Sequence, residues 1–159
     1  MKKRKINKQY LRKITSPEIK PTPLDALDFA TTVQRFAKDY LRGIMTVEIC
    51  GTPSSRVNVN IHVTSYLIRL LCDGIDDDEM VEVIFHFDDE MRIEARFKQL
   101  PDCDATGYMV NVAKLAGFRV SRDSETLFFH AKTDISSTMK IYANSQDLFL
   151  DLLITTYNM

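Results

Sequence analysis

The chain has 159 residues, of which 45% are hydrophobic and 27% charged, and this balance is typical of one globular domain with a single core. No apolar run reaches the roughly 18 residues that a membrane-spanning helix needs, and the basic N-terminus lacks the apolar segment of a secretory signal. The three cysteines share no metal-ligand spacing. We therefore expect a cytoplasmic protein with reduced thiols and no membrane span.

Positive charge is concentrated at the start of the chain. Residues 1–23 hold eight of the 21 Lys and Arg but one of the 22 Asp and Glu, and three prolines in 16–23 predict a linker. We expect 1–23 to be a flexible basic arm and 24–159 to be a single domain. The arm fits a solubilising tail, a contact with nucleic acid or an acidic lipid surface, or a contact with the domain's own acidic turn or a partner protein. The dispersed aromatic residues argue against binding to nucleic acid.

The first predicted elements are a helix and a strand. In 23–41 apolar side chains recur every three or four residues, with Thr22 as a cap and Gly43 at the end. Residues 45–50 alternate between apolar and polar, which predicts a half-buried strand.

The next segment changes its periodicity from two to that of a helix. We place a short strand from about Arg56 and a helix from Thr64, although a helix start as early as Asn60 also fits the pattern. The helix runs into an acidic turn at 76–79. Its apolar face is formed by residues at helical spacing, namely Leu67, Leu70, Leu71, Gly74 and Ile75.

Hairpins and short helices are predicted for the remainder. In order, these elements are a hairpin of 80–87 and 91–97, a loop at 100–106, a helix over 107–116 that starts at Gly107, a second hairpin of 118–121 and 126–132, and a strand over 139–143. The alternating strands, interrupted by helices, predict a two-layer α/β sandwich.

The last predicted helix, 145–157, is apolar around nearly its whole circumference. The apolar side chains are Leu148, Phe149, Leu150, Leu152, Leu153 and Ile154. A helix of this kind is buried on more than one side. Two interpretations follow: one face packs on the domain and the rest meets a second subunit or a partner protein, or the domain and the basic arm enclose the helix. Our hypothesis is a homodimer or another protein contact through this helix.

Two motifs resemble those of the histidine-kinase-like ATPase domain of gyrases, chaperones, histidine kinases and mismatch-repair proteins. The stretch 70–76, LLCDGID, resembles the family's Leu-Leu-x-Asn-Ala-Ile-x box. The stretch 107–118, from Gly-Tyr-Met-Val to Ala-Gly-Phe, resembles its Gly-Leu-x-Ile-Val helix and the glycine that follows. Together with the order of elements, the resemblance covers about 24–133. It implies a mixed, mostly antiparallel sheet with helices on one face.

The resemblance also implies a residual site for ATP and Mg²⁺. Asp73 stands where the family has its magnesium-binding asparagine, and Asp76 matches an acid that some members carry three residues later. A carboxylate supplies the hard oxygen that Mg²⁺ prefers. Gly107 is expected at a helix start, where free backbone N–H groups hold a phosphate.

Several family residues are replaced, and the replacements bear on activity. In the hydrolysing branch a glutamate four residues before the asparagine activates water, but Arg69 stands there and arginine cannot act as a base. The adenine-binding aspartate of the Asp-x-Gly-x-Gly turn is missing from 95–101, and the lid is short. The resemblance with these departures implies that nucleotide binding is weak or lost, and we assign no catalytic residue.

Three functions remain open on the sequence. The first is a regulatory or scaffolding protein built on a degenerate ATPase domain, which makes enzymatic activity doubtful. The second is an active ATP- and Mg²⁺-dependent protein kinase of the anti-sigma-factor type, which would use Asp73 for the metal and Gly107 for the phosphate. The third is a structural α/β interaction module unrelated to that family.

Overall fold

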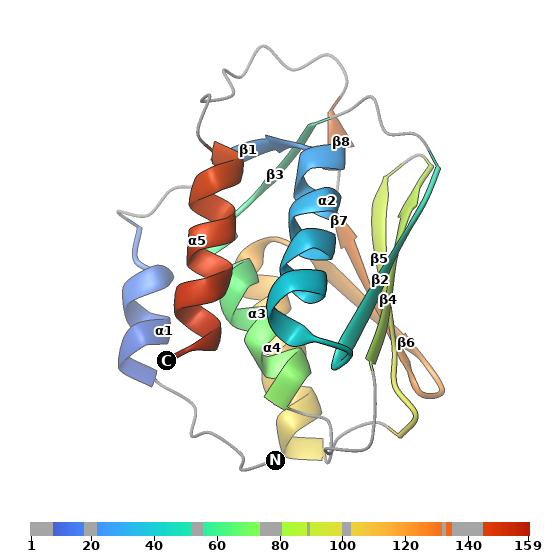
Figure 1. Ribbon diagram of the computed structural model, residues 1–159. Helices are drawn as coiled ribbons and strands as arrows, with labels where there is room; N and C mark the ends of the chain where they lie inside the picture. Colours follow the sequence, from blue (N-terminus) through green and yellow to red (C-terminus); the bar gives the residue numbers. More distant parts are fainter. Residues whose placement is uncertain are drawn as a thin grey trace.

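The computed structural model describes residues 8–17, 22–51, 56–73, 81–88, 90–99, 103–131, 133–134 and 145–159. Helices lie on one face of a five-stranded sheet, and a smaller three-stranded sheet lies at one end (Figure 1). In chain order the elements are α1 (Lys8–Ile14), β1 (Thr22–Asp25), α2 (Ala26–Phe36), a π-helical turn η1 (Ala37–Leu41), β2 (Met45–Cys50), β3 (Arg56–Val59), α3 (Ile61–Asp73), β4 (Val81–Phe87), β5 (Met91–Arg96), α4 (Cys103–Ala116), β6 (Arg119–Asp123), β7 (Thr126–Ala131), β8 (Thr133–Asp134) and α5 (Ser145–Tyr157). The predicted fold class, an α/β sandwich, is confirmed.

The large sheet is mixed, with the strand order β2-β4-β5-β7-β6. Strands β2 and β4 are parallel, and every other neighbouring pair is antiparallel. Both predicted hairpins, β4–β5 and β6–β7, are therefore confirmed. Strands β2 and β6 are the two edges of the sheet.

The two faces of this sheet differ because side chains alternate along each strand. Phe85 and Phe129 are buried on the face that the helices cover, where the ring of Phe85 meets that of Phe29 in α2 at 5.9 Å. The neighbouring positions, His86 on β4 and His130 on β7, point to the opposite face. Charged and polar residues of β4 to β7 thus gather on the face away from the helices.

A small sheet with the order β1-β3-β8 corrects the predicted start of the first helix. Thr22 pairs with Val59 and Asp25 with Arg56, so 22–25 is an edge strand and α2 begins at Ala26. Pro23 is tolerated there because an edge strand does not need every N–H for pairing. Non-local pairing with β3 has replaced the local helix cap. The predicted strand at 139–143 lies outside the described residues.

Asn60 sets the start of α3, three residues before the predicted one. Its side-chain Oδ1 accepts hydrogen bonds from the backbone N–H groups of His62, at 3.0 Å, and Val63, at 3.2 Å. This is a helix N-cap, in which the side chain satisfies N–H groups that have no partner within the helix. The amide Nδ2 of Asn60 also donates to the carbonyl oxygen of Ile14 at 3.1 Å, which ties α3 to the end of α1.

The described part of the expected basic arm is folded onto the body. Ile14 is 2% exposed and belongs to the core, and the ring of Tyr10 lies 5.9 Å from that of Tyr66 in α3. The hydroxyl of Tyr10 lies 3.4 Å from Oγ1 of Thr156 in α5. Over Lys8–Ile14 the expectation of a loose arm therefore does not hold, because Ile14 is in the core and Tyr10 contacts both α3 and α5. In Figure 1, α1 lies beside α5.

Docking of α1 predicts a pH dependence of stability through His62. Burial, followed by the charge of Lys13 in α1, lowers the pKa of His62 below its ordinary value of 6.5. Below about pH 6.5 the unfolded chain therefore binds this proton more readily than the folded protein does, so the free energy of unfolding should fall as the pH falls. Urea unfolding of the wild type and of His62→Gln between pH 8 and 5.5 measures the difference. Equal slopes for the two proteins would contradict this prediction.

Candidate functional site

Arg69 and Asp73 lie one turn apart at the end of α3, the helix that carries the first motif. Nε of Arg69 is 3.3 Å from Oδ2 of Asp73, and the two side chains are 4% and 12% exposed. The guanidinium of Arg69 also lies over the ring of Tyr66, 5.4 Å from its centre. A largely buried ion pair thus joins the two positions that the motif resemblance matches to the family's glutamate base and its magnesium-binding asparagine.

The ion pair with Arg69 makes the carboxylate of Asp73 a poorer ligand for a metal ion. A Mg²⁺ ion requires near-octahedral oxygen ligands and usually keeps several waters. The carboxylate of Asp73 instead has a fixed cation in contact with one of its oxygens. Bringing Mg²⁺ to this carboxylate would place two cations beside each other in a water-poor environment, where their repulsion is strong. The described geometry therefore suits a structural ion pair better than a metal ligand.

Helix α3 is buried around its whole circumference. Every residue from Val63 to Cys72 is buried, and ten consecutive residues cover all sides of a helix with 3.6 residues per turn. Helices α4 and α5 pack against it, with Phe149 and Leu153 of α5 in the core. Residues Val63–Cys72 are thus packed on all sides of the helix.

The other two predicted site residues are Asp76 and Gly107. Asp76 lies outside the described residues. Gly107 is the fifth residue of α4, because this helix begins at Cys103 within the predicted loop. Only the first four N–H groups of a helix lack a partner in the helix, so the expectation that Gly107 opens the helix and offers a free N–H is wrong. A phosphate site at Gly107 itself has lost its structural basis.

Replacing Gly107 with alanine tests this placement. No heavy atom lies within 4 Å of a Cβ added at Gly107, so the change should stabilise the protein by about 0.5–1 kcal/mol, the usual difference within a helix. Gly51→Ala is the opposite control, because Gly51 has φ +97° and its added Cβ would meet the carbonyl oxygen of Phe87 at 2.7 Å. Thermal unfolding of both variants gives the comparison. Destabilisation by Gly107→Ala would contradict a position inside α4.

The apolar side chains of α5 divide between its own domain and the surface. Phe149 and Leu153 are 0% and 1% exposed, and the ring of Phe149 stacks on that of Phe29 at 4.9 Å. Leu150, Leu152 and Ile154 are half-buried against the core, and Leu148 is 42% exposed. The domain and α1 thus enclose most of this helix, in line with the second interpretation. A contact with another protein through its exposed side stays a prediction.

A groove lies between α2, η1 and the edge strand β2. It has a volume of about 760 Å³ and is lined by residues of α2, η1 and β2, among them Gln34, Lys38 and Thr46. The amide of Gln34 donates to the carbonyl oxygen of Val47 at 3.1 Å, which covers part of the open edge of β2. Neither Asp73 nor Gly107 lines this groove.

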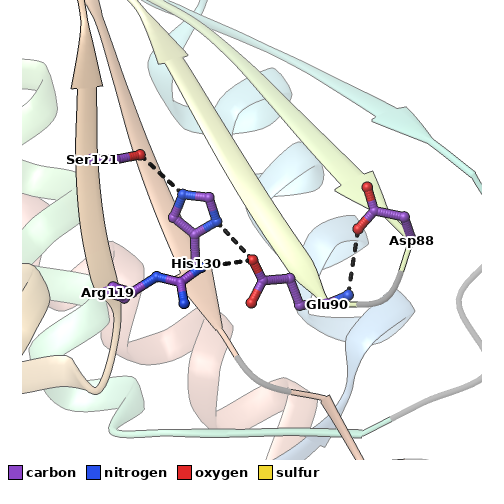
Figure 2. Close-up of polar contacts among 5 residues, drawn as sticks. All are labelled: Asp88, Glu90, Arg119, Ser121 and His130. Carbon is purple, nitrogen blue, oxygen red and sulfur yellow. Dashed lines mark hydrogen bonds and ion pairs between the residues drawn. The ribbon is translucent and has the colours of Figure 1, made fainter.

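The sequence patterns missed a polar cluster on the open face of the sheet (Figure 2). Ser121 Oγ lies 3.0 Å from Nε2 of His130, whose Nδ1 lies 2.8 Å from Oε1 of Glu90. Arg119 Nη2 is 3.0 Å from the same carboxylate oxygen. The sequence held one indication, since Ser121 and His130 lie on the same face of a predicted hairpin. Glu90 comes close to them only because β5 pairs with β7.

The described ranges hold neither a membrane-spanning helix nor a cluster of metal ligands. No described helix combines the length and the apolar character that crossing a membrane requires. Among the same residues, no three His, Cys, Asp or Glu side chains come together as a metal site would require.

The order and pairing of the elements place the chain among mixed-sheet α/β sandwiches. Comparison with known proteins gives the following similarities. No protein-family model and no curated protein matches the sequence. The cytoplasmic segment of the histidine kinase QseC is similar, with a TM-score of 0.45 and 14% identity over 70% of this chain and 77% of that one. Two nucleotide-free forms of the catalytic domain of the histidine kinase ThkA have TM-scores of 0.46 and 0.45 and identities of 10% and 9%, over 70% of this chain and 94% of theirs. These three solved structures are segments or domains of histidine kinases, and the chain is similar to them.

Proposed function

We propose that this protein is a regulatory or scaffolding protein built on a histidine-kinase-like ATPase fold whose nucleotide site is degenerate. The observation that carries the proposal is the ion pair between Arg69 and Asp73 in a helix that is buried all round. Its two residues stand at the positions where the resemblance places the water-activating glutamate and the magnesium-binding asparagine.

Charge and space both support the loss of the site. Hydrolysis needs a base near the attacking water, and an arginine side chain such as that of Arg69 cannot act as one in proteins. Triphosphate binding needs a cleft beside α3, but α4 and α5 cover this helix. Phe149 and Leu153 of α5, an element beyond the span of the resemblance, supply part of that cover. The protein would then act by binding another protein and not by turnover, and the exposed side of α5 at Leu148 is the proposed contact.

Calorimetric titration with ATP and Mg²⁺ tests this function. We expect no binding tighter than about 100 μM, which corresponds to roughly −5.5 kcal/mol. The double variant Arg69→Glu/Asp73→Asn restores the family's residue types, and it should also fail to bind because α3 stays covered. Binding by the wild type below about 100 μM would overturn the proposal. Binding by the double variant alone would confine the degeneracy to these two residues.

A further inference from the structure

The strand order of the large sheet brings Ser121, His130 and Glu90 together on the face that none of the described helices covers (Figure 1). Strands β6 and β7 pair Ser121 with Phe128 and Arg119 with His130, so Ser121 and His130 are diagonal neighbours on one face. Strands β5 and β7 pair Met91 with Ala131. Glu90 comes immediately before Met91, the first residue of β5, and therefore reaches His130 from the start of this strand (Figure 2).

The partners of His130 determine which ring nitrogen carries the proton. An ionised carboxylate only accepts hydrogen bonds, so Nδ1, at 2.8 Å from Oε1 of Glu90, must be the N–H donor in the neutral ring. Nε2 then has a free lone pair and accepts the hydroxyl proton of Ser121 at 3.0 Å. The polarity runs from serine to histidine to acid, as in the serine–histidine–acid triads of acyl-transfer enzymes.

Two further residues hold this arrangement in place. The carboxylate oxygen Oδ1 of Asp88 accepts the backbone N–H of Glu90 at 3.4 Å, which fixes the turn that presents Glu90. Arg119 Nη2 binds Oε1 of Glu90 from the other side at 3.0 Å. Arg119 is two residues from Ser121 on the same face of β6, and its exposed guanidinium lies beside Glu90.

Access favours a reaction at Ser121. Its side chain is exposed on β6, an edge strand, whereas the side chain of His130 is 15% exposed. We propose that Ser121 is a nucleophile that accepts acyl groups from activated esters, with His130 as the general base and Glu90 as the residue that positions it. This site is independent of the nucleotide site and of the function proposed above.

The acyl transfer balances without a cofactor. Ser121 Oγ forms a bond to the acyl carbon while its proton passes to Nε2 of His130. The bond between the acyl carbon and the ester oxygen then breaks, and the leaving oxygen takes the proton from Nε2. The products are an O-acyl serine and one alcohol or phenol, and no atom is oxidised or reduced.

Incubation with p-nitrophenyl acetate tests the proposal directly. The release of p-nitrophenol gives the rate, and peptide mass spectrometry gives the acetylated residue. We expect acetylation at Ser121 in the wild type and none there in Ser121→Ala. Ser124→Gly is the matched control, because it removes another serine of the same hairpin at a position with φ 55°, which suits glycine. This control should keep the wild-type rate.

His130→Gln and Glu90→Gln separate chemistry from simple hydrogen bonding. Loss of a general base should slow acetylation of Ser121 by about 100-fold or more in His130→Gln. Loss of the carboxylate should slow it by at least about tenfold in Glu90→Gln, because the Nδ1–H tautomer is no longer enforced. Nitrogen-15 NMR of the imidazole should show Nδ1–H in the wild type and an increased Nε2–H population in Glu90→Gln. Acetylation confined to lysines, or an unchanged rate in His130→Gln, would overturn the proposal.

Discussion

Phe149→Ala should lower the free energy of unfolding by about 3–5 kcal/mol, the usual cost of removing a buried aromatic side chain. Phe149 is 0% exposed and stacks on Phe29 at 4.9 Å, so the change would leave a cavity between α5 and α2 that neither helix can close without repacking. Denaturation in urea, monitored by circular dichroism, measures the loss.

Leu148→Ala is the matched control for this variant. Leu148 precedes Phe149 in the same helix but is 42% exposed, so its removal should change stability by no more than about 0.5 kcal/mol. Similar losses in both variants would mean that α5 is not docked through Phe149. A normal stability of Leu148→Ala together with the loss of a protein partner would support the contact proposed for this side of α5.

Asn60→Ala should destabilise the protein by about 2–4 kcal/mol, because one side chain makes two kinds of contact. Its Oδ1 caps α3, and loss of an N-cap costs about 1 kcal/mol. Its Nδ2 donates to the carbonyl oxygen of Ile14, which is left without this donor in the variant, and such a loss costs a further 1–3 kcal/mol or so. Urea unfolding measures the sum.

Asn60→Ser separates the two contributions. A serine hydroxyl still caps the helix but does not reach the carbonyl of Ile14, so its cost should lie between those of the wild type and Asn60→Ala. Hydrogen exchange in Lys8–Ile14 should rise in both variants, since both release the end of α1 from α3. Unchanged exchange in α1 would contradict the role of Asn60 as the link between the two helices.

The ion pair between Arg69 and Asp73 depends both on local helix geometry and on the tertiary structure. Arg69 and Asp73 are four residues apart on one helix, so their pairing follows from helical geometry alone. The two side chains are 4% and 12% exposed in a helix on which α4 and α5 pack. The pair therefore has a local origin, but the tertiary structure decides that it is withheld from solvent.

The sequence alone determined the elements whose pattern is local. The alternation in β4 and β5 predicted their hairpin, and the apolar spacing after Thr64 predicted the body of α3, because side-chain direction repeats every two residues in a strand and every 3.6 in a helix. The resemblance of the 70–76 motif, which contains Asp73, to the family's box likewise rests on consecutive residues alone.

Only the tertiary structure decided the features that depend on distant segments. Pairing with β3 made Thr22–Asp25 a strand although its residues suit a helix start, and α4 began at Cys103 and not at Gly107. Docking on α3 ordered Lys8–Ile14, whose charges had suggested a loose arm. The triad of Ser121, His130 and Glu90 needs the register of three strands, and such register is set by non-local hydrogen bonds and burial that no short pattern in the sequence records.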